Sequence, residues 1–393
     1  MLTSAWLMCA LAASAQVEAA SPNRGYTRAI PYKGSVADAL AASAAGSTIP
    51  MTSGKIVAAK DSNTYDVTIV GGNPLAASKT STTINFLIVP VIVDINATTF
   101  DPTASDGCLQ HNMSPLMAFV QSPLIQSVAF DGGTTDGHAS LINGVDVGTV
   151  TYPDAFRRAE FWSKVAGSNY HTRFKVSAAP AWTITASDVH NMGGGNVLTS
   201  GCALVGVLPS AGFENYISNT VIPGVPEITP TTFVLFLLKD VVTSDSSSLN
   251  CSTFCVIGYH SAFGSPVQTY AVAEYDSTYG FWAQQGIKDI SIITHEIGEW
   301  MDDPLVANET PAWGNIGQVS GCDLAWEVGD PLTGTDFPGI PMANGIIYHP
   351  QELAFWSWFY AANGNKSLGA GGKFSMNGTF QGPSQPCPPG GTY

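Results

Sequence analysis

One stretch of the chain, Ile287 to Pro304, restricts the fold more than any other part of the sequence. It reads IKDISIITHEIGEWMDDP, and apolar residues such as Ile293 and Ile297 recur at the spacing of one helix face. Asp289 is a suitable N-cap residue, and Pro304 is a suitable stop. The stretch therefore predicts a helix whose apolar side packs against a core.

The polar residues of this helix predict a metal site. His295 and Glu299 are four residues apart, so both side chains leave one side of the helix about one turn apart, with Glu296 beside them. In zinc peptidases the corresponding H-E-x-x-H motif supplies two histidine ligands and a glutamate that acts as general base. Here Glu299 replaces the second histidine. We therefore expect His295 and Glu299 to bind the metal and Glu296 to be the general base.

This replacement changes the chemistry that the site is expected to support. A divalent ion bound by one histidine and two glutamates has a formal net charge of zero, so it lowers the pKa of a bound water less than a site with two histidines does. More oxygen ligands also favour harder ions. Zn2+ is the expected cofactor, and another divalent cation is the alternative.

A third ligand is predicted in the acidic segment GCDLAWEVGDP, which spans Gly321 to Pro331. Glu327 and Asp330 are three residues apart, so they share one face of a one-turn element. We expect Glu327 to bind the metal and Asp330 to be an alternate ligand or to orient one. His260 and His349 are candidates for a further ligand or for a catalytic donor to a developing oxyanion. A lone histidine beside a tyrosine is, however, more often a satisfied core residue.

Two acidic residues, Asp302 and Asp303, end the predicted helix. Negative charge is unfavourable there, because the C-terminal end of the helix dipole is itself negative. We expect both carboxylates to meet a cation, an arginine or backbone N–H groups. Asp302 lies seven residues after His295 on the same side of the helix, so it is also a candidate to orient a ligand.

The rest of the chain predicts an α+β fold, with a mixed, twisted sheet, flanking helices and the metal helix packed beneath the sheet edge. Short β-type runs begin at Thr64, and the nearly continuous apolar run from Ile84 to Ile95 predicts a core strand. The run TYAVAEYD, from Thr269 to Asp276, predicts a strand that pairs with an extended peptide at a sheet edge.

A second helix is predicted from Thr151 to Trp162, in the run TYPDAFRRAEFW. Its aromatic and alanine residues are expected to face the core. Its charged residues, Arg157, Arg158 and Glu160, are expected to lie largely outward, on a solvated or bridging face.

The predicted organisation has four parts. Residues 1–15 form a signal peptide, because an apolar run is followed by the small-x-small pattern Ala13-Ser14-Ala15. Residues 16–60 are a loosely held lead-in or pro-segment, rich in Ala, Ser and Gly from residue 21 onward. Residues 61–245 form a β-rich lobe, and residues 246–393 form the lobe with the metal site, with the boundary near the polar run VTSDSSSLN.

Composition restricts the partners and the compartment. The net charge is −15 with only 15 lysines and arginines, which excludes nucleic acid as a partner. No run beyond the signal is long enough for a membrane span. Six cysteines remain after the signal, an even number that fits three disulfides in a secreted, extracellular protein, with fifteen pairings open. The oligomeric state is left open.

Several of these motifs together resemble known families. His295-Glu296-x-x-Glu299 resembles the zincin metallopeptidases. With Asp303-Pro304, Trp313 and Glu327-Val-Gly-Asp330 added, the pattern is similar to secreted phosphate-induced, EXORDIUM-like proteins and their bacterial relatives. TYPDAFRRAEFW and GYHSAF are also similar to the bacterial members. The resemblance covers roughly residues 80 to 360, most clearly 256 to 330, and implies a secreted, zinc-dependent protein.

The leading hypothesis is a secreted zinc hydrolase, a metallopeptidase acting on a peptide or protein substrate. The second is a non-catalytic extracellular or cell-wall protein, in which the same carboxylates hold a structural ion or a hydrogen-bond network. A closed site without a position for water would favour this second hypothesis. A third hypothesis is a glycosidase that uses two of the carboxylates without a metal.

Overall fold

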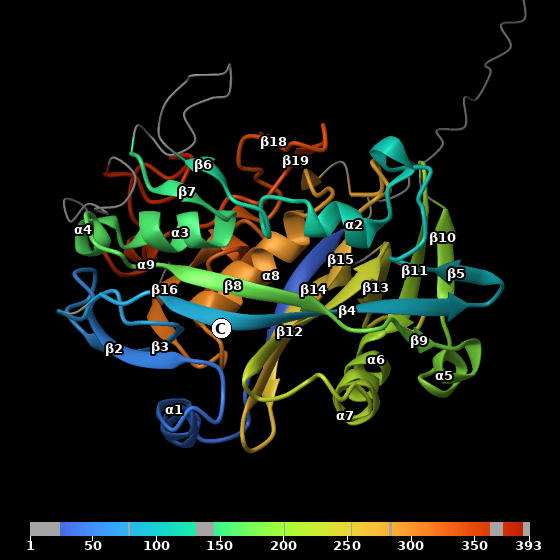
Figure 1. The fold of residues 1–393 in the computed structure, drawn as a ribbon, viewed down its shortest axis with the longest axis horizontal. Helices are drawn as coiled ribbons and strands as arrows, with labels where there is room; N and C mark the ends of the chain where they lie inside the picture. Colours follow the sequence, from blue (N-terminus) through green and yellow to red (C-terminus); the bar gives the residue numbers. More distant parts are fainter. Residues whose placement is uncertain are drawn as a thin grey trace, which may run out of the picture.

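The computed structural model describes residues 24–77, 79–130, 145–199, 201–252, 254–282, 285–361 and 372–387. The predicted signal peptide lies outside these residues. The fold is α+β, as predicted, and is built on one mixed, twisted sheet with helices on both of its faces (Figure 1).

The main sheet combines strands from both predicted lobes. In spatial order its strands are β10 (Asn196–Thr199), β11 (Leu204–Pro209), β13 (Val241–Ser244), β14 (Cys255–Phe263), β15 (Gln268–Tyr275), β12 (Thr232–Lys239), β4 (Thr82–Ile95) and β5 (Thr98–Phe100). Three further strands pair with members of this row, namely β1 (Gly25–Ile30) with β14, and β8 (Thr172–Ala178) and β9 (Trp182–Ile184) with β4. The predicted boundary near residue 245 falls in the connection between β13 and β14.

The remaining strands form two-stranded ribbons around this sheet. They are β2 (Met51–Val57) with β3 (Thr64–Val70), β6 (Val128–Phe130) with β7 (Gly148–Val150), β16 (Glu309–Ile316) with β17 (Val319–Ala325), and β18 (Ile340–Pro341) with β19 (Ile347–Tyr348).

The helices are mostly short. They are α1 (Val36–Ala44), α2 (Pro115–Val120), α3 (Tyr152–Glu160), α4 (Trp162–Val165), α5 (Ala186–Asn191), α6 (Ser210–Tyr216), α7 (Ile222–Gly224), α8 (Ser291–Asp302) and α9 (Trp356–Tyr360). In Figure 1, α3 and α8 lie above the sheet, whereas α5, α6 and α7 lie below it.

Strand β4 shows why the sequence forms this sheet. Its side chains alternate between the two faces, so that Phe86 and Ile88 join one core cluster while Leu87 and Val89 join the other. A strand that is buried on both faces must be apolar at nearly every position. The nearly continuous run in the sequence therefore predicted this central strand correctly.

Helix α8 occupies the centre of the upper layer. Every residue from Ser291 to Asp302 is buried, and the Trp300 ring stacks on Phe233 of β12 with 3.6 Å between ring centroids. Burying an aromatic side chain of this size contributes about 1.5–3 kcal/mol, so the packing fixes the helix firmly against the sheet. The predicted N-cap is wrong, because the cap position is Ile290, and Asp289 instead binds His349.

Three other expectations need correction. Residues 24–60 are not loosely held, because they form β1, α1 and β2. β15, which contains most of the run predicted to lie at a sheet edge, is flanked by β12 and β14 and has no free edge. The charged residues of α3 do not face solvent, because Arg157, Arg158 and Glu160 are all buried.

Arg157 explains why α3 turns its charges inward. Its Nη1 atom lies 2.8 Å from Asp302 at the end of α8, and its Nη2 donates to the carbonyl of Met301. Asp303 accepts hydrogen bonds from the N–H groups of Ala307 and Asn308. The two acidic residues at the end of α8 thus meet an arginine and backbone N–H groups, which confirms that prediction.

All six cysteines of the described residues are paired, as Cys108–Cys202, Cys251–Cys255 and Cys322–Cys387. Three disulfides fit an extracellular protein. Among the described residues, no helix has the length and apolar character needed to cross a membrane.

Candidate metal centre

Helix α8 brings the three polar residues of its motif together. One ligand atom each of His295, Glu296 and Glu299 lies within 4.8 Å of the others, and His295 Nε2 is 2.8 Å from Glu299 Oε1. All three side chains are buried, because α8 packs against β14 and β15. The helical spacing therefore places these residues as the sequence predicted.

Strand β14 adds His260 to this group. His260 Nδ1 lies 3.3 Å from Glu296 Oε2 and 3.5 Å from Glu299 Oε2. The close approach of strand and helix depends on Gly258, where a Cβ would lie 2.7 Å from Glu296 Oε1. Because strand residues alternate between faces, Gly258 and His260 face α8 together.

The segment after β17 supplies Glu327 and Asp330, but in different positions. Glu327 joins His260 and Glu299 in a second group whose ligand atoms all lie within 4.8 Å of one another. Asp330 instead lies beside His295, with 3.3 Å between Oδ1 and Nε2. Two groups thus share Glu299, and the sequence-based ligand set of His295, Glu299 and Glu327 is neither of them.

Hydrogen bonding distinguishes the two histidines. Gln351 donates its Nε2 hydrogen to the carbonyl of Gly329, so its Oε1 is free to accept from His295 Nδ1 at 3.2 Å. With Nδ1 as a donor and Nε2 facing the carboxylates of Glu299 and Asp330, His295 has the surroundings of an imidazolium.

Several buried atoms around His260 lack hydrogen-bond partners. Within the described part of the chain, His260 Nε2, Glu296 Oε1 and both carboxylate oxygens of Glu327 have no hydrogen-bond partner, although all are buried. His260 Nε2 and Glu327 Oε2 are 3.9 Å apart, too far for a hydrogen bond. Buried polar atoms are normally paired, and an imidazole nitrogen with carboxylate oxygens is a donor set that binds Zn2+. His260, Glu299 and Glu327 therefore fit a divalent metal ion.

The electrostatics of the cluster are consistent with a cation site. Burial lowers the pKa of His260 to about 4, which keeps its imidazole neutral and able to donate a lone pair. Burial raises the pKa of Glu296 and of Glu327 well above the ordinary value. Burial acts in the same sense on Glu299, but the neighbouring His295 outweighs it and lowers the pKa of that carboxyl. Metal binding requires the ligand carboxyl groups to be deprotonated, so a cation bound by Glu327 would oppose this rise in its pKa.

His349 is not brought into this cluster. Its Nδ1 lies 2.6 Å from Asp289 Oδ2, just before the start of α8, and its side chain is 28% exposed. Asp302, which was a candidate for orienting a ligand, is held by Arg157.

Sequence reasoning missed the residues that surround His295. Thr27 Oγ1 of β1 lies 2.7 Å from His295 Nε2, and Gln318 binds both Thr27 and Asp330. No local signal identifies Thr27, which is 268 residues away from His295. Gln351 lies two residues after His349, so the correct segment was identified but the wrong member of it was chosen.

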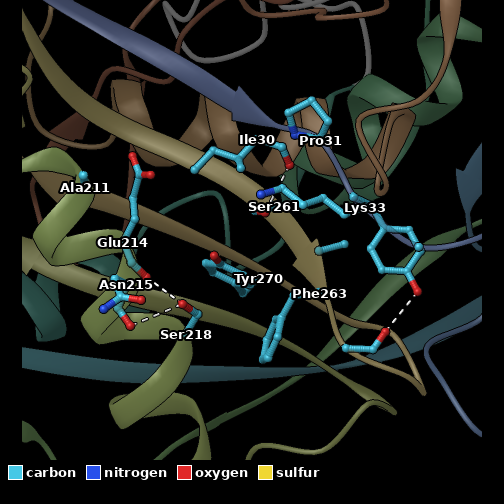
Figure 2. Close-up of a pocket in the computed structure, with 14 residues that line it drawn as sticks. Ile30, Pro31, Lys33, Ala211, Glu214, Asn215, Ser218, Ser261, Phe263 and Tyr270 are labelled. Atoms are coloured by element: carbon cyan, nitrogen blue, oxygen red, sulfur yellow. Dashed lines mark hydrogen bonds between the residues drawn. The ribbon is translucent and has the colours of Figure 1, made fainter.

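A surface pocket of about 500 Å3 lies elsewhere (Figure 2). It is lined by residues such as Lys33, Glu214, Phe263 and Tyr270, and none of the cluster's residues lines it. Comparison of the chain with protein-family models, with curated proteins and with solved structures finds no match. The function is therefore inferred from the buried cluster itself.

Proposed function

We propose that this protein is a secreted, zinc-dependent hydrolase, and specifically a metallopeptidase, whose metal ligands are His260, Glu299 and Glu327. The observation that carries the proposal is the set of buried, unpartnered ligand atoms on His260 and Glu327, which converge with Glu299. Secretion is supported by the three disulfides and by the N-terminal sequence pattern.

Glu296 is the general base in this proposal. It lies beside the ligand group, with Oε2 3.3 Å from His260 Nδ1, and its Oε1 has no partner among the described residues. A bound zinc ion lowers the pKa of its water, which makes that water easier to deprotonate. His295 is not a ligand here, and its positive charge offsets part of the negative charge of Glu299 and Asp330.

The test compares wild type with Glu296→Gln. We expect purified wild type to contain about one zinc equivalent and to hydrolyse an unfolded protein substrate. Glu296→Gln should keep the metal and lose hydrolysis by a factor of about 10²–10⁴, the range that general base catalysis contributes. Equal hydrolysis by both proteins would contradict the role of Glu296.

The complete burial of the cluster favours a second candidate, a non-catalytic extracellular protein with a structural ion. All three proposed ligands are at most 3% exposed. A structural site is closed, whereas a catalytic site keeps a position for water. Metal binding with no hydrolysis of any peptide, even after the cluster is made accessible, would support this candidate.

A further inference from the structure

We propose that the edge of β14 beside the cluster, from Gly258 to Ser261, is a binding slot for an extended peptide. In the structure, β1 fills this slot. This inference deepens the proposed function, because it identifies how a peptide substrate reaches the buried cluster and what blocks it. Peptide binding in the slot can be measured without hydrolysis, so the two proposals can fail separately.

Among the described residues, the sheet offers one edge next to the cluster. β15 is paired on both sides, and β13 pairs with β14 only through Thr243 and Val256. From Gly258 to Ser261 the second edge of β14 is paired with β1, in parallel register. The strand that covers His260 is therefore a segment close to the N-terminus.

Two glutamines hold the other side of β1 by its backbone. Gly25 donates its N–H to Gln285 Oε1 at 2.6 Å, and Gln285 Nε2 donates to the carbonyl of Gly25 at 3.0 Å. Gln318 forms the same pair of bonds with Thr27, at 3.0 Å each. Alternate residues of a strand expose their N–H and C=O on one side, so the two amides act like a neighbouring strand. Such contacts recognise an extended backbone and do not select its side chains.

The occupant lies directly against the cluster. Thr27 pairs with Gly258 of β14, and its Oγ1 is 2.7 Å from His295 Nε2 and 3.4 Å from Asp330 Oδ1. Thr27 itself is only 7% exposed. A different peptide in the same register would place one residue at this position, and β1 must leave before that peptide can enter.

The connection after β1 is accessible to cleavage. Pro31 and the run from Lys33 to Ser35 are exposed, and Pro31 and Lys33 are among the residues that line the pocket of Figure 2. Arg28 is held at the surface by Glu214 and Asp245, and exposed ion pairs of this kind contribute little. Cutting the connection would leave β1 held by the slot, by the ion pairs of Arg28 and by the hydrogen bond from the N–H of Tyr32 to the carbonyl of Leu305.

The experiment uses the full chain with a specific protease recognition sequence inserted between Lys33 and Gly34. The probe is a fluorescent synthetic peptide with the sequence of residues 24–33, and zinc release to a chelator is followed in parallel. After cleavage we expect the labelled peptide to exchange into the slot and zinc release to become at least tenfold faster than in the uncut chain. Hydrolysis of unfolded protein should be at least tenfold faster after cleavage than in the uncut chain.

A second variant tests the slot without relying on removal of β1. Gln285→Ala/Gln318→Ala should reduce binding of the labelled peptide to the cut chain by at least tenfold. Gln126→Ala is the matched control and should not change this binding, because Gln126 is exposed and its side chain donates to the carbonyl of Val120, away from β1.

Each outcome separates the two proposals. Peptide exchange and faster zinc release without hydrolysis would support the slot and overturn the hydrolase. A β1 fragment that stays bound and does not exchange with the labelled peptide would overturn the slot. Hydrolysis by the uncut chain at the rate of the cut chain would overturn the blocking role of β1 while supporting the hydrolase.

Discussion

Two clusters of buried carboxyl groups in this molecule differ in how their oxygens are used. The metal cluster consists of His260, His295, Glu296, Glu299 and Glu327. The carboxyl cluster consists of Asp240, Glu274 and Asp276, near the ends of β12 and β15. Every one of these side chains is at most 3% exposed.

The carboxyl cluster is held by hydrogen bonds from its neighbours. Asp240 accepts from the N–H and the hydroxyl of Ser277, at 2.7 and 2.6 Å, and Glu274 accepts from the indole N–H of Trp282 at 2.8 Å. Asp276 accepts from the N–H and hydroxyl of the same residue, Thr278.

The metal cluster has fewer donors of this kind: Glu299 accepts from the N–H of Gly329 at 3.2 Å, but no group among the described residues donates to Glu327. Both oxygens of Glu327 and one ring nitrogen of His260 have no partner among the described residues, whereas Glu274 and Asp276 each leave only one oxygen unpaired. The ligand atoms of the metal cluster also converge within 4.8 Å in two groups that share Glu299. Burial of acids alone does not make a metal site, and the comparison shows that convergence of unpartnered atoms is the distinguishing feature.

The largest expected difference between the clusters is in how much zinc raises the free energy of unfolding. At a zinc concentration about a thousand times Kd, binding should raise the free energy of unfolding of wild type by about 4 kcal/mol. Glu327→Gln should lose this increase, and Glu274→Gln should keep it. Denaturant unfolding with zinc and with chelator measures both. An equal loss in the two variants would remove the distinction between the clusters.

A smaller difference is expected between the unfolding free energies of variants in the two clusters when a chelator is present. Asp240→Ala leaves the N–H and hydroxyl of Ser277 without their acceptor, which should cost about 1–3 kcal/mol of unfolding free energy. Glu327→Gln should cost less, because no N–H or hydroxyl group among the described residues donates to its carboxyl group. If Glu327→Gln proves the more destabilising under chelator, its carboxyl has a structural partner and the comparison is wrong.

The third effect, of at most about 1.4 kcal/mol for each pH unit, concerns the pH dependence of the carboxyl cluster. Burial, followed by the charge of Asp276, raises the pKa of Asp240 from 3.8 to about 8. Between these values the folded state holds a proton that the unfolded state has released, so this group's contribution to stability falls as pH rises. The limit for one proton is about 1.4 kcal/mol per pH unit.

Asp240→Asn removes this titration. The difference in unfolding free energy between Asp240→Asn and wild type should therefore rise by up to about 1.4 kcal/mol per pH unit between pH 5 and pH 7. Urea unfolding of both proteins at several pH values, with chelator present, measures it. A difference that does not change with pH would show that Asp240 is ionised in the folded protein.

Local patterns in the sequence predicted the metal helix and part of its surroundings. The helical spacing from His295 to Glu299 placed their side chains together, and the dipole argument correctly anticipated partners for Asp302 and Asp303. The even number of cysteines correctly indicated three disulfides. These features depend on short-range geometry or on counting.

What the sequence did not predict depends on pairing between distant segments. The register of β1 on β14 places Thr27 beside His295, and no local pattern encodes a parallel pairing across more than 200 residues. Local sequence patterns also could not predict which of the two histidines, His260 or His295, is available to bind a metal. His295 is distinguished from His260 by the amide of Gln351, which comes from another segment.

The central claim is that His260, Glu299 and Glu327 form the metal site, and metal content tests it most directly. Glu327→Gln and Glu296→Gln should be purified in parallel, loaded with zinc, freed of excess metal and analysed for zinc per chain. The account predicts about one equivalent in Glu296→Gln and almost none in Glu327→Gln. The reverse result would contradict it and would assign the metal to the other group, His295, Glu296 and Glu299.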